Sequence, residues 1–100
     1  MKIERFEDIE SWKLARELTN QVYKITSTEN FRKDFGLKDQ IQRASVSIMA
    51  NIAEGFDSGT NKSFANFLNY AYRSASEVQS LLYIALDQKY IREKEHKVLY

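Results

Sequence analysis

Apolar residues recur along most of this chain at alternating spacings of three and four, which places them on one face of an α-helix. The first such stretch runs from Asp8 to about Thr26, and its stripe consists of Ala15, Leu18, Val22 and Ile25. Asp8 is a residue type that caps helix N-termini. Residues 27–30, Ser-Thr-Glu-Asn, are typical of a loop. We therefore expect a first helix over residues 8–26.

A second stretch with the same spacing starts near Asp34 or Phe35. We expect it to end at Gly55, because glycine suits the position just after a helix C-terminus. Its apolar stripe consists of Leu37, Ile41, Ala44, Ile48 and Ile52.

A third stretch begins after a cap at Thr60 or Asn61 and extends to about Gln88. Its stripe consists of Phe64, Leu68, Ala71, Ala75, Val78, Leu82 and Ala85. Residues 92–100 resemble the start of a fourth helix that is short or truncated. Proline is absent and there are only three glycines, so little interrupts these helices. The pattern predicts an all-α, up-and-down helical bundle without strands, with residues 1–100 forming a single domain.

Composition narrows the range of functions. The chain has no cysteine, which excludes disulfides and zinc sites built on thiolates. The charged N-terminal residues do not resemble a signal peptide, and no apolar run reaches the ~20 residues of a membrane span. We expect a cytoplasmic protein without membrane contact. Its formal net charge is only +1, whereas nucleic-acid binders usually concentrate positive charge.

Candidate catalytic groups are few. His96 is the single histidine. It follows Glu93 at the Glu-x-x-His spacing of di-iron bundles, but those sites need a second such motif. No serine lies in a Gly-x-Ser-x-Gly motif, and no phosphate-binding loop is present. We expect no enzyme activity, no metal and no cofactor.

Several polar residues interrupt the apolar parts of the second and third predicted helices. Because buried charges are costly unless they are paired, we expect these residues to form one structural polar network. The network consists of Arg43, Asn51, Glu54, Arg73 and Glu77. In it, Arg73 pairs with Glu77 one turn away, and Arg43 reaches Glu77 across the helix interface. The alternative is a carboxylate site formed by Glu54 and Glu77.

Basic residues gather near the polar side of the first helix and in the segment that follows it. A shallow nucleic-acid-binding face would consist of Lys13, Arg16, Lys24, Arg32, Lys33 and Lys38. The alternative is an ordinary solvated surface of mixed charge. The second and third helices also carry more apolar surface than one bundle core can use, so we expect the protein to self-associate.

The same residues carry a family resemblance. Phe35 to Leu37, Gln40 to Ala44, Ser47-Ile48 and above all Asn51-Ile52-Ala53-Glu54-Gly55 are similar to the signature of bacterial four helix bundle proteins. That family includes proteins encoded in intervening sequences of large-subunit ribosomal RNA genes. It also includes relatives of the accessory variability determinant of diversity-generating retroelements.

The resemblance implies an antiparallel four-helix bundle, here with a short or truncated fourth helix, that assembles in some members as a homopentamer. It further implies RNA or DNA as a ligand and a reverse transcriptase as a possible partner. Two functional hypotheses follow. The first is a non-enzymatic oligomeric scaffold of the intervening-sequence type that binds RNA or DNA. The alternative is a protein-interaction adaptor without nucleic-acid contact.

Overall fold

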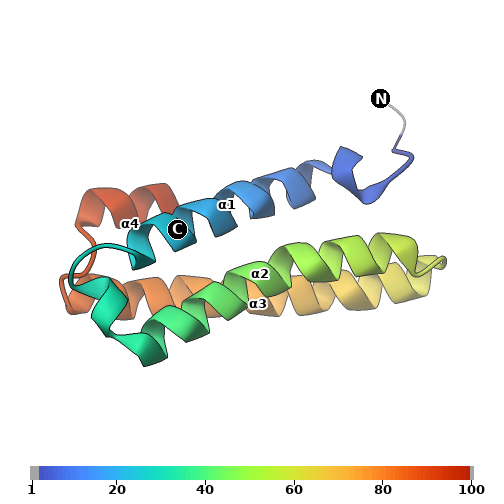
Figure 1. Cartoon of the computed structure of the whole chain (residues 1–100). Helices are drawn as coiled ribbons and strands as arrows, with labels where there is room; N and C mark the ends of the chain where they lie inside the picture. Colours follow the sequence, from blue (N-terminus) through green and yellow to red (C-terminus); the bar gives the residue numbers. More distant parts are fainter. Residues whose placement is uncertain (1–2, 100) are drawn as a thin grey trace.

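The computed structural model describes residues 3–99, and four α-helices make up most of this range (Figure 1). Helix α1 is Glu10–Thr26, α2 is Phe35–Asp57, α3 is Asn61–Asp87 and α4 is Glu93–Leu99. Two single-turn 3-10 helices, η1 (Phe6–Asp8) and η2 (Phe31–Lys33), precede α1 and α2. Successive helices run in opposite directions, and residues 3–99 contain no strand. The predicted all-α, up-and-down fold with a short fourth helix is confirmed; Tyr100, its predicted last residue, lies outside the described range.

The long hairpin of α2 and α3 forms the body of the molecule, and α1 packs against α2 (Figure 1). The molecule is elongated, with principal extents of 43 × 24 × 18 Å. Helix α4 covers only the part of the bundle near the C-terminal ends of α1 and α3, because it is short and ends at Leu99. None of the helices in residues 3–99 is both long and apolar enough to cross a membrane.

The core is built from the predicted stripes. Val22, Ile41, Val78 and Leu82 are almost fully buried, and Phe31 of η2 closes one end of the core. Each large aliphatic side chain buried in this way contributes roughly 1.5–3 kcal/mol. The prediction is wrong for Leu68, which is 39% exposed. It lines an open groove between α1 and α3, so solvent reaches its side chain.

Two of the predicted helix ends are confirmed. The Asp34 carboxylate caps α2, with its Oδ1 accepting a hydrogen bond from the Leu37 N–H at 3.1 Å. The Thr60 hydroxyl caps α3 and accepts from the Ser63 N–H at 3.1 Å. Each side chain pairs one of the backbone N–H groups that the first turn of a helix leaves without a partner.

Two other predicted helix ends are wrong. Asp8 ends η1 and does not cap α1; its Oδ2 accepts from the Glu4 N–H at 3.1 Å instead. Gly55 does not end α2, which continues to Asp57, and the left-handed turn belongs to Gly59 with φ of 89°. Gly55 is needed for a different reason. A Cβ at this position would lie 2.7 Å from the Phe67 Cβ, so α2 and α3 can approach this closely only at a glycine.

Candidate interaction surfaces

Most of the predicted basic residues already contact an acidic or an aromatic side chain. Lys13 Nζ lies 3.8 Å from the Glu10 carboxylate. Arg32 and Lys33 share the Glu29 carboxylate, at 3.2 and 3.5 Å. An incoming phosphate would have to compete with these acids. The pairs are exposed and worth only about 0–1 kcal/mol each. Glu10 offsets the charge of Lys13, whereas Glu29 offsets only one of the two charges of Arg32 and Lys33.

Arg16 and Lys38 lie over aromatic rings instead. The Arg16 guanidinium is 5.9 Å from the centre of the Trp12 ring, and Lys38 Nζ is 5.1 Å from the centre of the Phe35 ring. Their side chains therefore shield apolar surface while the charge stays near solvent. Five of the six predicted residues therefore have an acidic or aromatic side chain beside them.

Lys24 differs from the other five, and it belongs to a cleft that the sequence pattern does not indicate. The cleft has a volume of about 410 Å³ and lies between the C-terminal half of α1 and helix α4. Arg92 and Lys94 contribute two further cations to its walls. They are far from Lys24 in sequence, and only the return of α4 toward α1 brings the three together (Figure 1).

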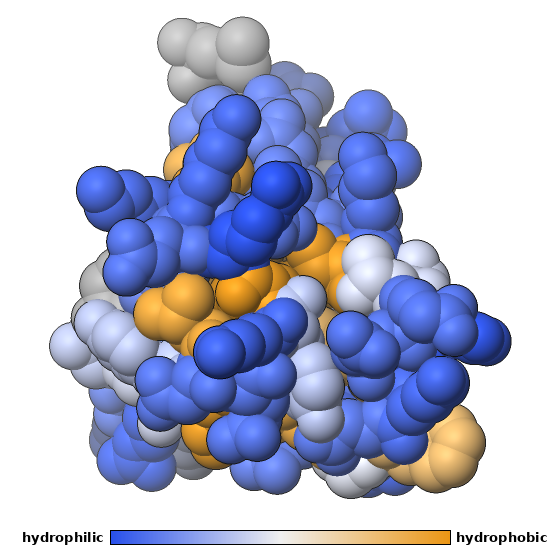
Figure 2. All heavy atoms as spheres, turned by 90° about the vertical axis from the view of Figure 1, so that its left-hand side faces the viewer, coloured by the Kyte–Doolittle hydropathy of each residue, from blue (hydrophilic) through white to orange (hydrophobic). Residues whose placement is uncertain are grey.

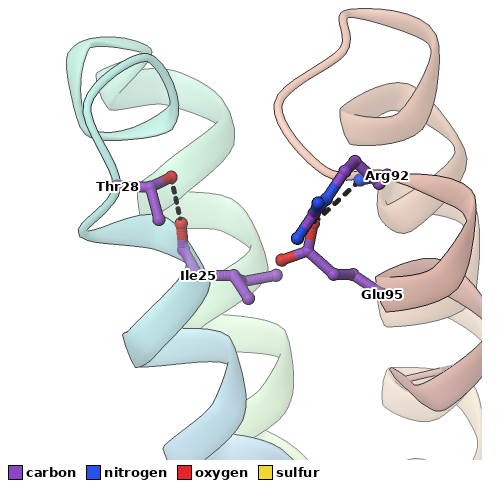
Figure 3. A network of polar contacts seen from close by, with 4 residues as sticks. All are labelled: Ile25, Thr28, Arg92 and Glu95. Atoms are coloured by element: carbon purple, nitrogen blue, oxygen red, sulfur yellow. Dashed lines mark hydrogen bonds and ion pairs between the residues drawn. The ribbon is translucent and has the colours of Figure 1, made fainter.

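The close-up shows two of the charged residues of this cleft, Arg92 and Glu95 (Figure 3). Arg92 and Glu95 pair with each other: Glu95 Oε1 accepts from the Arg92 backbone N–H at 2.9 Å and lies 3.5 Å from its Nε. The Ile25 side chain faces them from α1. Within residues 3–99, the ammonium groups of Lys24 and Lys94 have no carboxylate within 4.0 Å and no hydrogen-bond partner. The cleft is therefore lined by two cations that have no counter-charge within residues 3–99, together with the apolar residues Ile25, Val98 and Leu99.

A larger apolar groove of about 520 Å³ lies between α1 and α3, next to the end of α4. Ile48 and Ile52 of α2 lie beneath it. Its sides are formed by Leu14 and Leu18 of α1, Leu68 and Tyr72 of α3, and Val98 of α4. Tyr72 is 71% exposed and Val98 is 70% exposed. Figure 2 looks onto the end of the molecule where α4 begins, not along this groove, and shows apolar surface in the middle of that end, framed by hydrophilic residues.

The predicted buried network is corrected by the structure. The Arg43 side chain is 80% exposed and pairs with Asp39 at 3.0 Å, one turn earlier in α2. Glu77 is also exposed, and it accepts from the Gln40 amide at 3.3 Å. The expected pairs Arg43–Glu77 and Arg73–Glu77 are therefore not formed within one chain. These helices turn their polar faces to solvent, which costs less than burying a charge.

The remaining members of the network have separate roles. Asn51 is half-buried and donates to the carbonyl and hydroxyl oxygens of Ser47, at 2.8 and 2.9 Å. Ser74 of α3 donates to the same Ser47 hydroxyl at 2.9 Å, so these three residues link α2 to α3. Among the described residues, Glu54 and Arg73 are exposed and contact no charged partner. Glu54 and Glu77 lie at different levels of the hairpin and do not form a carboxylate site.

A perturbed pKa occurs where two connections of the chain meet. Tyr90 follows α3, and its hydroxyl donates to Asp34 Oδ2 at 3.0 Å. This hydrogen bond, together with desolvation and the Asp34 charge, raises the pKa of the Tyr90 phenol. The Tyr90 ring also packs on Phe31, with ring centres 5.1 Å apart. The arrangement fastens the start of α2 to the end of α3.

The single histidine does not belong to a group of acids. His96 lies on α4 with its ring centre 4.6 Å from that of Tyr83. Within residues 3–99, no three His, Asp or Glu side chains gather in a way that could hold a metal ion.

Its elongated antiparallel arrangement of helices places this chain in the class of small all-α bundle proteins. The chain matches the family described as 23S rRNA-intervening sequence protein over residues 7–100. It therefore belongs to that family, as the Asn51 to Gly55 string indicates. No curated protein matches the chain.

Proposed function

We propose that this protein is a non-enzymatic helical scaffold that assembles from several copies of itself and binds RNA or DNA. The observation that carries self-association is the open groove between α1 and α3. Leu14 and Tyr72 are each more than half exposed along it, and neither lines the cleft between α1 and α4. Contiguous apolar surface of this kind in a soluble protein usually marks a contact site. A second copy would remove it from water.

The expected state in solution is an oligomer, and the family resemblance favours a homopentamer. Light scattering coupled to size exclusion measures this directly at micromolar concentration. The expected mass is a multiple of the 11.8 kDa chain. Tyr72→Glu places a charge at the centre of the contact and should yield monomers. A parent protein that elutes as a clean 11.8 kDa species contradicts the proposal.

A matched control separates the groove from tyrosine surface in general. Tyr23 is 48% exposed and lies on α1 away from the groove. Tyr23→Glu introduces the same charge at a similar residue and should leave the oligomer intact. Dissociation by Tyr23→Glu, with Tyr72→Glu still oligomeric, would place the contact on the other side of the molecule.

Nucleic-acid binding is supported by Lys24 and Lys94, the cleft cations that have no counter-charge among residues 3–99. In an oligomer each copy repeats them, so a modest charge per copy builds a larger local potential. Binding of this kind releases counterions and should weaken steeply with salt. The test is fluorescence anisotropy with RNA and DNA oligonucleotides at low salt. Absence of binding at tens of micromolar would favour the adaptor that contacts proteins alone.

A further inference from the structure

We propose that the cleft between α1 and α4 binds one nucleotide of a single-stranded nucleic acid, with the phosphate between Lys24 and Lys94. This inference rests on the proposed function, since it presupposes that nucleic acid is bound. It moves the contact from the predicted face along α1 to the junction of α1 and α4. It also assigns a role to Lys94 and Val98, which the sequence pattern did not single out.

Charge is the first argument for this location. Glu95 is the single acid among the described residues that line the cleft, and it is occupied by the Arg92 side chain and backbone N–H. Lys24 and Lys94 are left without a counter-charge in the same part of the chain. A phosphate placed between them gains two cations without breaking an ion pair. At Lys13, Arg32 or Lys33 it would have to displace a carboxylate.

The apolar wall is the second argument. Ile25 and Leu99 are buried at the base of the cleft, and Val98 projects beside them with 70% of its surface exposed. These side chains offer a flat apolar contact for a base or a ribose. The Gln21 amide also lines the cleft, and it can both donate to and accept from the edge of a base.

The size of the cleft and the accessibility of the bases favour a single strand over a duplex as its ligand. The cleft volume of about 410 Å³ lies within the range of small-ligand sites, which is roughly 300–1,000 Å³. In a duplex the bases are stacked and paired, so their faces are unavailable to an apolar wall. In a single strand a base can be turned outward and held by side chains. The cleft should therefore prefer a single strand to the duplex of the same length.

The test is an anisotropy titration of the full chain with a short fluorescein-labelled single-stranded RNA, and with its duplex, over a series of salt concentrations. The double variant Lys24→Gln/Lys94→Gln should bind the single strand about tenfold more weakly or worse. Its salt slope should fall by about 0.7, because the single phosphate held between the two lysines is no longer neutralised. The control Lys13→Gln/Lys33→Gln removes the same charge from paired sites and should change affinity less than about twofold.

A second measurement reports the apolar contact independently of charge. In methyl NMR spectra of the parent, addition of the RNA should shift the Val98 and Ile25 resonances. Val46, an exposed valine on α2 away from the cleft, is the matched control and should not shift. Val98→Asn should weaken binding of the single strand by about threefold to tenfold, which is less than the loss of an aromatic stacking partner because the aliphatic side chain covers less of the base. The fold should be unchanged because the side chain is mostly exposed.

The outcomes separate this inference from the broader function. One outcome is that the parent binds the single strand, the cleft variants bind it with unchanged affinity and the control pair binds it more weakly. This outcome overturns the proposed site in the cleft and leaves nucleic-acid binding in place. Equal or tighter binding of the duplex also overturns the cleft. A parent that does not bind either probe overturns nucleic-acid binding as a whole, and the self-association test is unaffected.

Discussion

At Gly55 the absence of a Cβ allows α2 and α3 to approach each other closely. An added Cβ would lie 2.7 Å from the Phe67 Cβ and 3.0 Å from the Phe64 Cδ1. The Phe67 Cβ is fixed to the backbone and cannot swing away, so the helices themselves would have to move apart. Gly36, in the first turn of α2, differs: its nearest neighbour for a Cβ is the Asp34 Oδ1, 4.0 Å away.

These two glycines should respond in opposite directions to alanine. Gly55→Ala is expected to lower the free energy of unfolding by about 1–3 kcal/mol, because overpacking forces the interface apart. Gly36→Ala should raise it by about 0.5 kcal/mol, because alanine restricts the unfolded chain and favours helix. Urea denaturation followed by circular dichroism measures both. Equal effects of the two substitutions would contradict the close contact at Gly55.

The Tyr90–Asp34 hydrogen bond predicts a pH dependence. The folded pKa of Tyr90 is raised above the unfolded value of 10.0, so the folded state favours the protonated phenol. Its stabilising contribution is fully present below the unfolded pKa of 10.0 and is lost as the pH rises through the folded pKa. Tyr90→Phe should therefore be less stable than the parent near neutral pH, and the difference should shrink at strongly alkaline pH. Thermal unfolding at several pH values checks this, and a constant difference would contradict it.

Exposure also sets the expected effect of changing Glu77. Had the side chain been buried against a cation, its removal would cost about 3–5 kcal/mol. Because Glu77 is exposed and accepts from the neutral Gln40 amide, Glu77→Ala should change the free energy of unfolding of the monomer by less than about 0.5 kcal/mol. Chemical denaturation of a monomeric background such as Tyr72→Glu measures it. A loss of several kcal/mol there would revive the buried network.

At the scale of elements, the end of α3 shows how a helix is stopped without glycine. The Tyr90 N–H donates to the Ala85 carbonyl at 2.9 Å, and the Lys89 N–H donates to the Leu86 carbonyl at 3.0 Å. This is a Schellman motif, in which the residue after the C-cap is left-handed. Lys89 occupies that position with φ of 64°. A residue with a Cβ is strained in this conformation. The motif nevertheless forms, and it turns the chain toward α4.

Relief of this strain should be measurable. Lys89→Gly is expected to stabilise the protein by about 0.5–1 kcal/mol, because glycine adopts the left-handed region without a steric penalty. Gln88, one residue earlier, has φ of −80° and is the control. Gln88→Gly should destabilise by a similar amount. Thermal melts of the two variants compare them, and destabilisation by Lys89→Gly would show that its side chain makes a contact worth more than the strain.

Helix α4 depends on its surroundings more than the other elements do. Its seven residues are fewer than the ~12–15 that an isolated helix needs in water. The Glu95 carboxylate caps its first turn, and the burial of Leu99 anchors its end. Its position nevertheless shapes both surfaces, since Val98 borders the groove and the cleft alike.

At the scale of the whole molecule, the open groove links folding to assembly. If several copies bury it, the oligomer is favoured over unfolded chains by mass action, and the unfolding midpoint rises with protein concentration. We expect this rise in the parent between micromolar and hundreds of micromolar, and no rise in Tyr72→Glu. Calorimetry at several concentrations measures it. A midpoint independent of concentration in the parent would indicate that the groove stays open.

Much of the fold followed from local pattern. The three-four spacing located α1, α2 and α3 and placed the start of α2 near Asp34 or Phe35, and Thr60 was one of the two residues expected to cap α3. The family resemblance likewise rested on contiguous residues, such as Asn51 to Gly55, and the family match confirms it. These features depend on neighbours within one or two turns, which the sequence shows directly.

The surfaces were decided by tertiary structure. Whether Arg43 and Glu77 are covered depends on how α2 and α3 are rotated about their own axes. The apolar stripes can stay buried over a range of such rotations, and some of these expose the polar residues beside the stripe. Lys24 and Lys94 line one cleft only because the motif at Lys89 directs α4 back along α1. The sequence alone determined which faces are apolar, since periodicity is local; packing determined which residues those faces bring together, since that requires the path of the whole chain.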